Sequence, residues 1–324
     1  MAKFIGLGNA LVDIIVFLDD DALLEELLLP RGSMQLVDFE RSGMIRNACE
    51  HLKQSFASGG SAANTMHAIA RLGAETSFIG KIGEDDYGRI FREDLEKHNI
   101  NPILFISETH SGRAVALISP DTERTFATHL GAAIELSAEE LNHEHFSEHD
   151  IFHIEGYCVQ DHELMIKAVK LAKNNGMKIS IDMASYNVVE DNLDFLKELI
   201  HEYVDIVFAN EDEAKAFTGK APGDALNEIA SMCEIAVVKI GKEGSLIKRG
   251  DEVHQIPAIE ARVVDTNGAG DIYAAGFLYG LSQDWPLEKC AMAGGILAGK
   301  IIEITGARLN DKGWEKALDL IAKL

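Results

Sequence analysis

The sequence has few cysteines and no long apolar run. Its cysteines lie far apart and form no C-x-x-C pair, which indicates free thiols in a reducing compartment. No apolar run approaches the roughly 18 residues that a membrane span needs. The first residues also lack the basic and apolar regions of a signal peptide. We therefore expect a cytoplasmic protein that does not bind membranes. The four cysteines are Cys49, Cys158, Cys233 and Cys290.

Positive charge is scarce as well. The 324 residues include 30 Lys and Arg against 53 Asp and Glu, for a formal net charge of -23. A surface this acidic repels nucleic acid and anionic lipid, so neither is an expected partner. It would also repel a polyphosphate, so binding one would require backbone N–H groups, a divalent cation and a few well-placed Arg or Lys. The length allows one large α/β domain or two moderate ones, and the hydrophobic fraction of 47% suits a globular protein with a sizeable core.

Several familiar motifs are missing. The chain has no G-x-x-x-x-G-K-[ST] phosphate loop and no G-x-S-x-G nucleophile turn. G-L-G-N-A-L at 6–11 begins like a dinucleotide fingerprint but lacks the third glycine, so an oxidoreductase has only weak support. The histidines of 143–153 match no compact metal-ligand spacing, which favours a solvated charged loop.

The second half of the chain alternates regularly between strand and helix patterns. This alternation predicts βαβ units and a parallel sheet with right-handed crossovers. The expected strands there are 151–154, 177–182, 205–209 and 235–240, followed by a short β-stretch at 245–256. The expected helices are 161–174, 192–202, 211–217, 224–232, 271–281, 287–303 and 312–323. Before them, we expect strands 3–8 and 76–83 and helices 61–72 and 87–98.

Other β-segments do not fit this alternation. They are 12–18, 34–38 and a hairpin of 113–119 and 123–129 joined by Pro120–Thr122, with a helix expected at 21–28. We interpret them as a small sheet at one edge that acts as a lid. The predicted organisation is an α/β core of 1–11, 51–102 and 131–324, with a small β lid of 12–50 and 103–130.

The stretch D-T-N-G-A-G-D at 265–271 directly precedes an apolar helix. Gly268, Ala269 and Gly270 let the backbone approach a ligand closely, and the N-terminus of the helix favours an anion. The same dipole favours an ionised Asp271, which could accept a hydroxyl proton during phosphoryl transfer. The alternative is an Asp that merely caps a helix after a glycine turn.

Three further loops follow expected strands. G-G-S-A-A-N at 59–64 predicts close approach to a hydroxylated substrate with Asn64 as a partner, or simply tight helix packing. N-E-D-E-A at 210–214 places Asn210 and Glu213 on one side, which suits Mg²⁺ or an ordinary capped helix. I-G-K-E-G-S at 240–245 could hold phosphates through N–H groups and Lys242, or form a hairpin turn.

Together and in this order, these motifs resemble the ribokinase-like, or PfkB, family of sugar and nucleoside kinases over nearly the whole chain. G-G-S-A-A-N-T-M-H-A-I-A-R-L-G at 59–73 and F-I-G-K-I-G-E-D-D-Y-G at 78–88 are similar to its N-terminal signature. D-T-N-G-A-G-D is similar to its C-terminal signature, and N-E-D-E to its Asn-x-x-Glu motif. The resemblance implies a mostly parallel sheet flanked by helices, a small β lid, and ATP-dependent phosphorylation of a primary hydroxyl.

The resemblance also implies residue roles. Asp271 would be the base, in a turn begun by Gly268, with an anion hole of the N–H groups of Ala269, Gly270 and Asp271. Glu213 and Asn210 would organise Mg²⁺ through water. The acceptor would bind Asn9, Asp13, Gly59, Gly60 and Asn64, and Arg124 would meet the transferred phosphate. The nucleotide would lie beside Lys239, Gly241, Gly244, Asn267 and Ala298. A monovalent cation such as K⁺ would lie near Asp265 and the Asn267 carbonyl.

The expected acceptor is a nucleoside such as adenosine, with a sugar as the alternative. G-N-A-L-V-D-I at 8–14, P-R-G-S-M-Q-L-V-D at 30–38 and T-F-A-T-H-L-G-A-A at 125–133 are similar to adenosine kinases, and Tyr157 stands where those enzymes place an aromatic beside the base. M-A-S-Y-N at 183–187 departs from that branch, as does Lys239, which replaces a small residue. The family resemblance leaves two assemblies open, a monomer and a homodimer formed through the lid.

Overall fold

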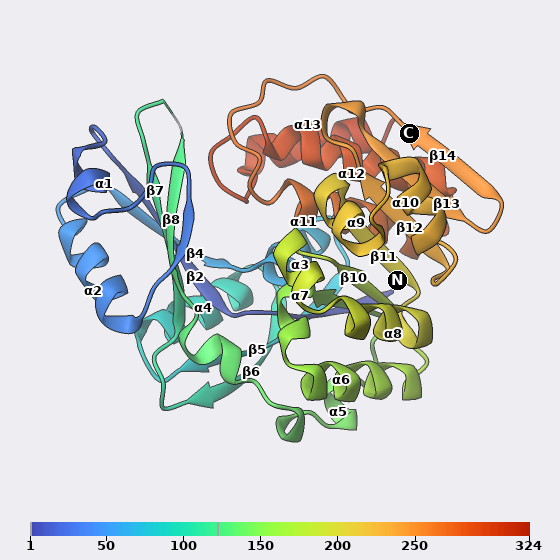
Figure 1. Cartoon of the computed structure of the whole chain (residues 1–324), viewed down its shortest axis with the longest axis horizontal. Helices are drawn as coiled ribbons and strands as arrows, with labels where there is room; N and C mark the ends of the chain where they lie inside the picture. The colour runs from blue at the N-terminus through green and yellow to red at the C-terminus, as the bar shows by residue number, and fades with distance from the viewer. Residues whose placement is uncertain (1, 122) are drawn as a thin grey trace.

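The computed structural model describes residues 2–121 and 123–324. Met1 and Thr122 lie outside the described residues, and Thr122 belongs to the predicted hairpin turn. The chain forms one large sheet with helices on both faces and a second, smaller sheet at its side (Figure 1). This is the α/β arrangement that the alternation of strand and helix patterns predicts.

The large sheet has nine strands. Seven neighbouring strands are parallel, and the last two along the chain extend the sheet as an antiparallel hairpin. The order across the sheet is β14 (Glu252–Ile256), β13 (Ser245–Arg249), β12 (Ile235–Lys239), β11 (Ile206–Asn210), β10 (Lys178–Asp182), β9 (Ile151–Glu155), β1 (Lys3–Leu7), β5 (Glu75–Gly83) and β6 (Ile100–Ser107).

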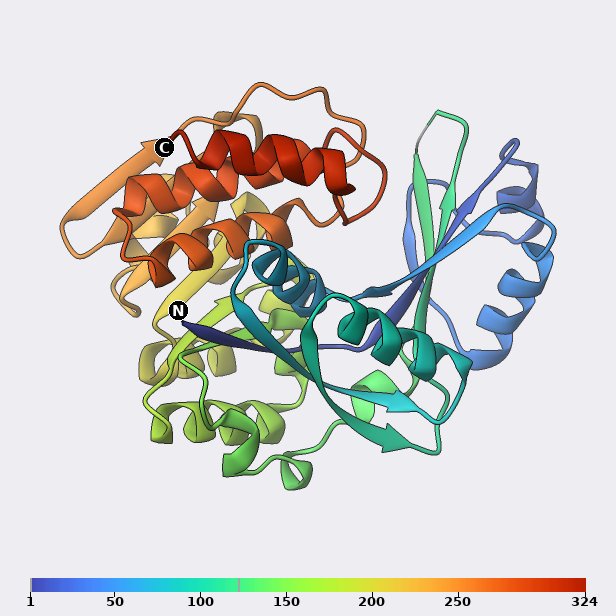
Figure 2. The same cartoon turned by 180° about the vertical axis from the view of Figure 1, so that it is seen from behind.

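Both faces of the large sheet are covered, as parallel strands require. Along β11, Ile206 and Phe208 face one helix layer, while Val207 and Ala209 face the other. Figures 1 and 2 show these layers from the two sides. One layer is α3 (Ser61–Arg71), α4 (Asp86–Lys97), α11 (Ala269–Ser282), α12 (Leu287–Ile301) and α13 (Asp311–Ile321). The other is α5 (His143–Phe146), α6 (His162–Asn174), α7 (Tyr186–Asp191), α8 (Leu193–Tyr203), α9 (Glu211–Thr218) and α10 (Pro222–Ile229).

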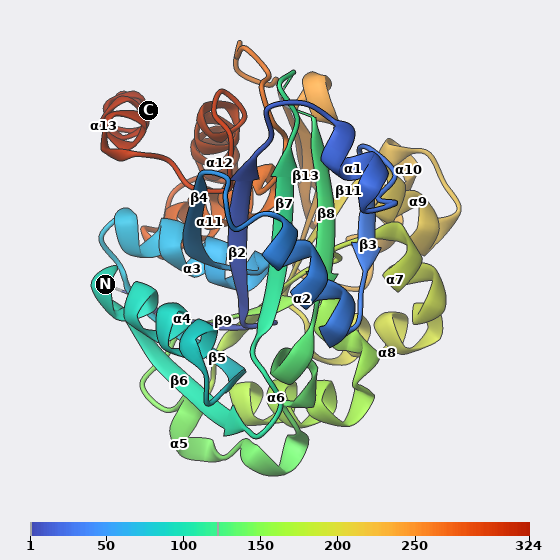
Figure 3. The same ribbon diagram turned by 90° about the vertical axis from the view of Figure 1, so that its left-hand side faces the viewer.

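The small sheet is mixed. Its strands lie side by side in Figure 3, with two short helices across the outer face, α1 (Ala22–Glu26) and α2 (Phe39–Ala48). Val12, Ile14 and Val16 of β2 are buried toward these helices, so the alternate residues face the large sheet. The strand order is β3 (Met34–Leu36), β8 (Arg124–His129), β7 (Gly112–Ile118), β2 (Leu11–Phe17) and β4 (Gln54–Gly59).

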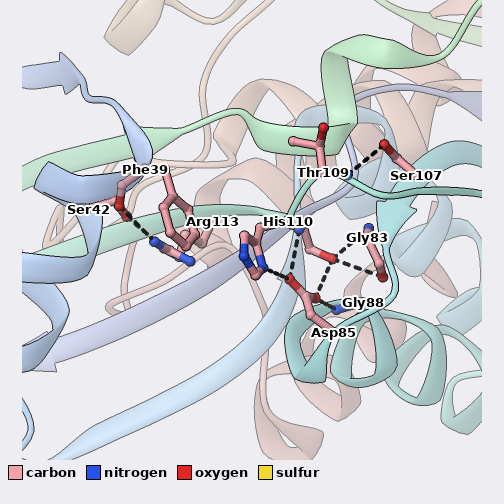
Figure 4. Close-up of polar contacts among 10 residues, drawn as sticks. Phe39, Ser42, Gly83, Asp85, Gly88, Ser107, Thr109, His110 and Arg113 are labelled. Atoms are coloured by element: carbon pink, nitrogen blue, oxygen red, sulfur yellow. Dashed lines mark hydrogen bonds and ion pairs between the residues drawn. The ribbon is translucent and has the colours of Figure 1, made fainter.

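The chain crosses between the two sheets at several points. One crossing, between β6 and β7, is fixed by Asp85, the N-cap of α4 (Figure 4). The Asp85 carboxylate accepts hydrogen bonds from the Ser111 N–H at 2.9 Å and the Ser111 hydroxyl at 2.7 Å. Nearby, Arg113 of β7 donates to the Ser42 hydroxyl at 2.7 Å, which ties α2 to the same sheet. The small sheet is therefore anchored to the large one at this end.

The structure contains elements that the sequence analysis did not predict. These are α2, α7, β4 and β6. The α2 sequence F-E-R-S-G-M-I-R-N-A has no helical apolar stripe, and β6 contains Pro102, which disfavours a strand except at a sheet edge. The histidine segment 143–153 was interpreted as a solvated charged loop, but 143–146 form α5 and His153 is fully buried. The start of β9 at Ile151 agrees with the strand expected at 151–154.

Two strands also differ from the predicted core and lid segments. β4 lies in the small sheet although 51–102 was assigned to the core, and β6 continues to Ser107 in the large sheet although the lid segment was to begin at 103. Both differences occur where a strand was not recognised. The division into a core and a lid that closes remains a prediction.

Candidate active site

Charged side chains gather where the parallel strands of the large sheet end. Glu155, Asp182 and Lys239 are the last residues of β9, β10 and β12, and Asn210 ends β11 at the start of α9. The N-termini of α3 and α11 meet at the same edge, where α3 side chains bond Asp271. Ligands of open α/β sheets bind beyond the carboxyl ends of the strands, so this edge is the candidate site.

Asp271 lies in the first turn of α11 and is held by α3. Its carboxylate accepts hydrogen bonds from the Ser61 hydroxyl at 2.7 Å and from the Asn64 amide at 3.0 Å. Burial raises the pKa of Asp271 to about 6, although the two donors oppose this shift. The carboxylate is thus fixed in direction and ionised near neutral pH, as a base for a hydroxyl proton must be.

The turn before Asp271 presents backbone donors. Gly268, the N-cap of α11, has φ of 73°, a conformation that favours glycine, and a side chain there would meet Ala307 at 2.6 Å. The Ala269 N–H donates to the Thr266 carbonyl at 3.2 Å. The N–H groups of Gly270 and Asp271 have no acceptor among the described residues. The predicted anion hole is therefore smaller, with two amides open to a ligand.

Asp13 of β2 reaches this space from the small sheet. Its carboxylate lies directly over Gly59, where an added Cβ would come within 2.3 Å of Asp13 Oδ1. Burial raises the pKa of Asp13 to about 6, while Arg308 and Arg124 lower it. Glycine at position 59 is thus needed for the position of Asp13.

Sequence reasoning missed Glu155. This residue is 2% exposed, and its carboxylate accepts hydrogen bonds from the Asn9 amide at 2.9 Å and from the Ala62 N–H at 3.1 Å. Burial raises the pKa of Glu155 to about 7. Gly60 is packed just as closely, because a side chain there would meet the Asn9 carbonyl at 2.3 Å. Glu155 therefore fixes Asn9 and the start of α3, two parts of the predicted acceptor site.

Arg308 was also missed. It lies in the loop between α12 and α13, and its Nη1 is 2.5 Å from Asp94 Oδ2 of α4. Its Nη2 donates to the carbonyl and hydroxyl of Ser58 in β4. The loop after α12 is thereby tied to the small sheet next to Gly59.

Asn210 and Glu213 form a capping box at the start of α9. The Asn210 amide and N–H donate to the two Glu213 carboxylate oxygens at 2.6 and 2.7 Å. Burial and the Asp182 carboxylate raise the pKa of Glu213 to about 7. Both oxygens are engaged, so these residues fit a Mg²⁺ ion held through water better than one bound directly. Among residues 2–121 and 123–324, no three His, Cys, Asp or Glu are grouped to hold a metal.

Lys239 and Asp182 form an ion pair of 2.7 Å in which both side chains are mostly buried. Lys239 lies where the sequence analysis expected a nucleotide contact, but Asp182 was not singled out. An added Cβ at Gly270 would lie 3.0 Å from Lys239 Nζ, so the pair adjoins the turn before Asp271.

Asp265 is paired with Arg124 of β8. Arg124 Nη2 lies 2.6 Å from Asp265 Oδ2, and both side chains are 7% exposed. The carboxylate also accepts hydrogen bonds from the N–H groups of Asn267 at 3.0 Å and Gly306 at 2.9 Å. A guanidinium therefore already neutralises the carboxylate proposed for a monovalent cation, so in this arrangement the residues do not fit such an ion. The predicted contact of Arg124 with a phosphate would require it to leave Asp265.

The remaining predicted residues are more dispersed. Tyr157 is half-buried in the short helix η3 (Gly156–Gln160) after β9, and Ala298 is partly buried in α12. Asn267 is exposed. Gly241 begins η4 (Gly241–Glu243), between β12 and β13. Gly244 packs against β14, since a side chain there would meet the Ile256 carbonyl at 1.9 Å. Its glycine is thus explained by the hairpin turn, which was the alternative interpretation. No helix in the described part of the chain could cross a membrane.

Comparison with known proteins gives a consistent result. Residues 35–312 match the family described as pfkB family carbohydrate kinase. A probable sugar kinase from Rhizobium etli is 31% identical, with a TM-score of 0.88 over 98% of both chains. The adenosine kinase from Sinorhizobium meliloti is 31% identical, with a TM-score of 0.87 over 98% of this chain and 99% of that one.

A nucleoside kinase from Methanocaldococcus jannaschii is 28% identical over 271 residues, which are 82% of this chain and 85% of the relative. These findings confirm the resemblance that the sequence motifs suggested, and they agree with the observed pair of sheets. The chain belongs to the pfkB family of carbohydrate kinases.

Proposed function

We propose that this member of the pfkB family transfers a phosphoryl group from ATP to the primary, 5′ hydroxyl of a nucleoside such as adenosine. The family makes the chain a phosphotransferase with an alcohol acceptor. The observation that carries the proposal is the Asp271 carboxylate, which Ser61 and Asn64 hold beside two open N–H groups. A base and an anion site in one place suit phosphoryl transfer.

In this mechanism, Asp271 accepts the proton of the acceptor hydroxyl as its oxygen bonds to phosphorus. The bond from phosphorus to the ADP oxygen breaks, and the N–H groups of Gly270 and Asp271 offset the charge on the transferred group. Glu213 and Asn210 would hold the water shell of a Mg²⁺ ion, which supplies charge neutralisation for the phosphates when bound. An ionised Asp271 is required, so activity rises with pH through about 6.

One carboxylate and one amide are placed to bind the hydroxyls of the acceptor. Asp13 reaches the site from the small sheet, and Asn64 Oδ1 is a buried acceptor with no partner among the described residues. A donated hydroxyl would satisfy it, and a buried acceptor left unpaired costs stability. A furanose ring placed there would direct its primary hydroxyl to Asp271, which already bonds Asn64.

The nucleoside is favoured over a free sugar by Tyr157, which is half-buried next to Glu155 and could stack on a base. The likeness to an adenosine kinase over 98% of this chain supports the same choice. A sugar acceptor is the second candidate, because the similarity to a probable sugar kinase is equal at 31% identity.

The test is to incubate the purified chain with ATP, Mg²⁺ and single acceptors, namely adenosine, other nucleosides, ribose and fructose, and to measure ADP. We expect kcat/KM for a nucleoside to exceed that for every sugar by at least about tenfold, since only the nucleoside can stack. ³¹P NMR of the product should place the phosphate on the primary carbon. Faster turnover of a sugar would establish the second candidate, and no turnover of any acceptor would contradict both.

A further inference from the structure

A lysine lies beside the first turn of α11, where the predicted anion hole consisted of backbone donors alone. Lys239 ends β12 and pairs in register with Asn210 of β11. Its Nζ nevertheless lies 2.7 Å from Asp182 Oδ2 at the end of β10, so the side chain crosses the end of β11. The ammonium is thus carried toward the middle of the site rather than out to solvent.

This ammonium lies next to the predicted anion hole, beside Gly270. A Cβ at position 270 would lie 3.0 Å from Lys239 Nζ and 3.9 Å from Asp182 Oδ2. The Gly270 N–H is one of the two first-turn amides without an acceptor in the described part of the chain. Ammonium and amides therefore border the same space.

The ammonium is charged and held in place. The side chains of Lys239 and Asp182 are 16% and 7% exposed. Lys239 Nζ donates to Asp182 Oδ2 at 2.7 Å, and an opposite charge this close favours the ammonium form. The second oxygen of Asp182 accepts the Ala184 N–H at 3.1 Å, which fixes the carboxylate. The lysine thus keeps its charge in a site with little freedom to move.

We propose that Lys239 is a catalytic residue that contacts the phosphoryl group during its transfer, and that Asp182 is a positioning residue that holds the ammonium for this contact. The inference deepens the proposed kinase function and rests on it. Lys239 keeps its protons throughout, because the acceptor proton goes to Asp271 and only the phosphorus–oxygen bonds change.

The charges in the site explain the need for such a residue. The transferred group carries negative charge on three oxygens, and it must approach the Asp271 carboxylate. The chain as a whole has a formal net charge of -23, so its overall electrostatic field also repels a polyphosphate. Two neutral amides leave this repulsion largely uncompensated, whereas an adjacent ammonium opposes it directly.

The competing explanation is a structural ion pair that ties β12 to β10 across β11. If the pair is purely structural, a variant that lacks it should have lower thermal stability, and its affinity for every nucleotide should change by the same factor. A contact with the transferred group instead predicts selective loss of affinity for nucleotides that carry a γ-phosphate. Comparing ADP with a non-hydrolysable ATP analogue therefore separates the two, and calorimetric binding needs no turnover.

The experiment measures both affinities in the presence of Mg²⁺ for the wild type, Lys239→Met, Lys239→Arg and Asp182→Asn. The matched control is Lys173→Met, since Lys173 Nζ lies 2.7 Å from Asp205 Oδ2 before the start of β11, at the opposite end of that strand. We expect Lys239→Met to weaken binding of the analogue by about ten- to hundredfold and that of ADP by less than about threefold, as loss of a charged hydrogen bond implies. Asp182→Asn should weaken the analogue less than Lys239→Met does, and the control should alter neither.

Thermal unfolding of each variant is measured alongside. If Lys239→Met does not fold, the charge-keeping Lys239→Arg decides, and it should retain most of the preference for the analogue over ADP. Equal weakening of both nucleotides, or none, would overturn the inference, and so would a wild type that binds neither. A wild type that binds both but phosphorylates no acceptor would contradict the proposed function alone, because the affinity ratio still tests Lys239.

Discussion

Removing the Ser61 hydroxyl should move the pH dependence of catalysis. Ser61 is the first residue of α3, and its Oγ donates to Asp271 Oδ1 at 2.7 Å. This bond favours the ionised carboxylate and so opposes burial, which raises the pKa of Asp271 to about 6. Ser61→Ala deletes the donor and leaves the Asn64 amide in place. We therefore expect the pKa of Asp271 to rise further in this variant.

The size of the shift follows from the strength of the bond. A hydrogen bond to a charged group contributes about 1.5–3 kcal/mol, and one pKa unit corresponds to about 1.4 kcal/mol. Because water can replace part of the lost bond, we expect a rise of about one unit. At about pH 6 the ionised fraction would fall from about a half to about a tenth, so kcat/KM should drop about fivefold. Above about pH 8 both proteins should agree within about twofold.

The assay is the pH profile of kcat/KM, which reports ionisation in the free enzyme. ADP formation is measured at fixed ionic strength, with excess coupling enzyme. The control is Ser282→Ala, at the other end of α11, where the hydroxyl donates to the Tyr279 carbonyl at 2.7 Å. Its profile should match the wild type. An acid limb that does not move in Ser61→Ala would refute the reasoning, as would an equal loss of activity at every pH.

Three other predictions rest on single contacts. Gly59→Ala should raise the acceptor KM at least about tenfold with the ATP KM unchanged, because its Cβ would lie 2.3 Å from Asp13 Oδ1, whereas Gly43→Ala, with open space, should not. Arg124→Ala leaves the buried Asp265 carboxylate without its guanidinium partner, so the melting temperature of this variant should fall by several degrees. Adding KCl should raise the melting temperature of the variant more than that of the wild type. Asp271→Asn should abolish turnover but raise the melting temperature at about pH 8, and normal turnover would exclude Asp271 as the base.

The strand and helix pattern was sufficient to predict the parallel sheet, and it indicated the sheet edge that we propose as the site. Asp271, Asn210 and Glu213 follow strands or begin helices, so their positions depend on local sequence, and the structure gathers them at one edge. β6 was missed because Pro102 disfavours a strand, which the fold tolerates by placing β6 at the sheet edge. Patterning therefore brings the candidate residues to one sheet edge better than it predicts every element around them.

The partners within the site could not be predicted in the same way. Asp182 is 57 residues from Lys239, and Arg308 is 214 residues from Asp94, so no local period relates them. A usable signal did exist for Glu155 and Asp182, because each is a carboxylate at the end of a strand that the sequence pattern predicts. In a parallel sheet that position faces the ligand edge, and a buried charge there needs a partner.

The buried carboxylates also explain why the site must cost stability. The pKa values of Asp13 and Asp271 are raised to about 6 and those of Glu155 and Glu213 to about 7, in each case mainly by burial. Between about pH 4 and 7 the folded chain therefore binds more protons at these groups than the unfolded chain does. Their contribution to the free energy of unfolding is present below this range and is lost as the pH rises through it. At the pH where Asp271 could act as a base, these buried carboxyl groups are ionised, although the folded protein favours their neutral forms. Under the proposed mechanism, a substitution that stabilises the fold by removing the Asp271 charge therefore also removes the base, and Lys239 offsets only part of that charge.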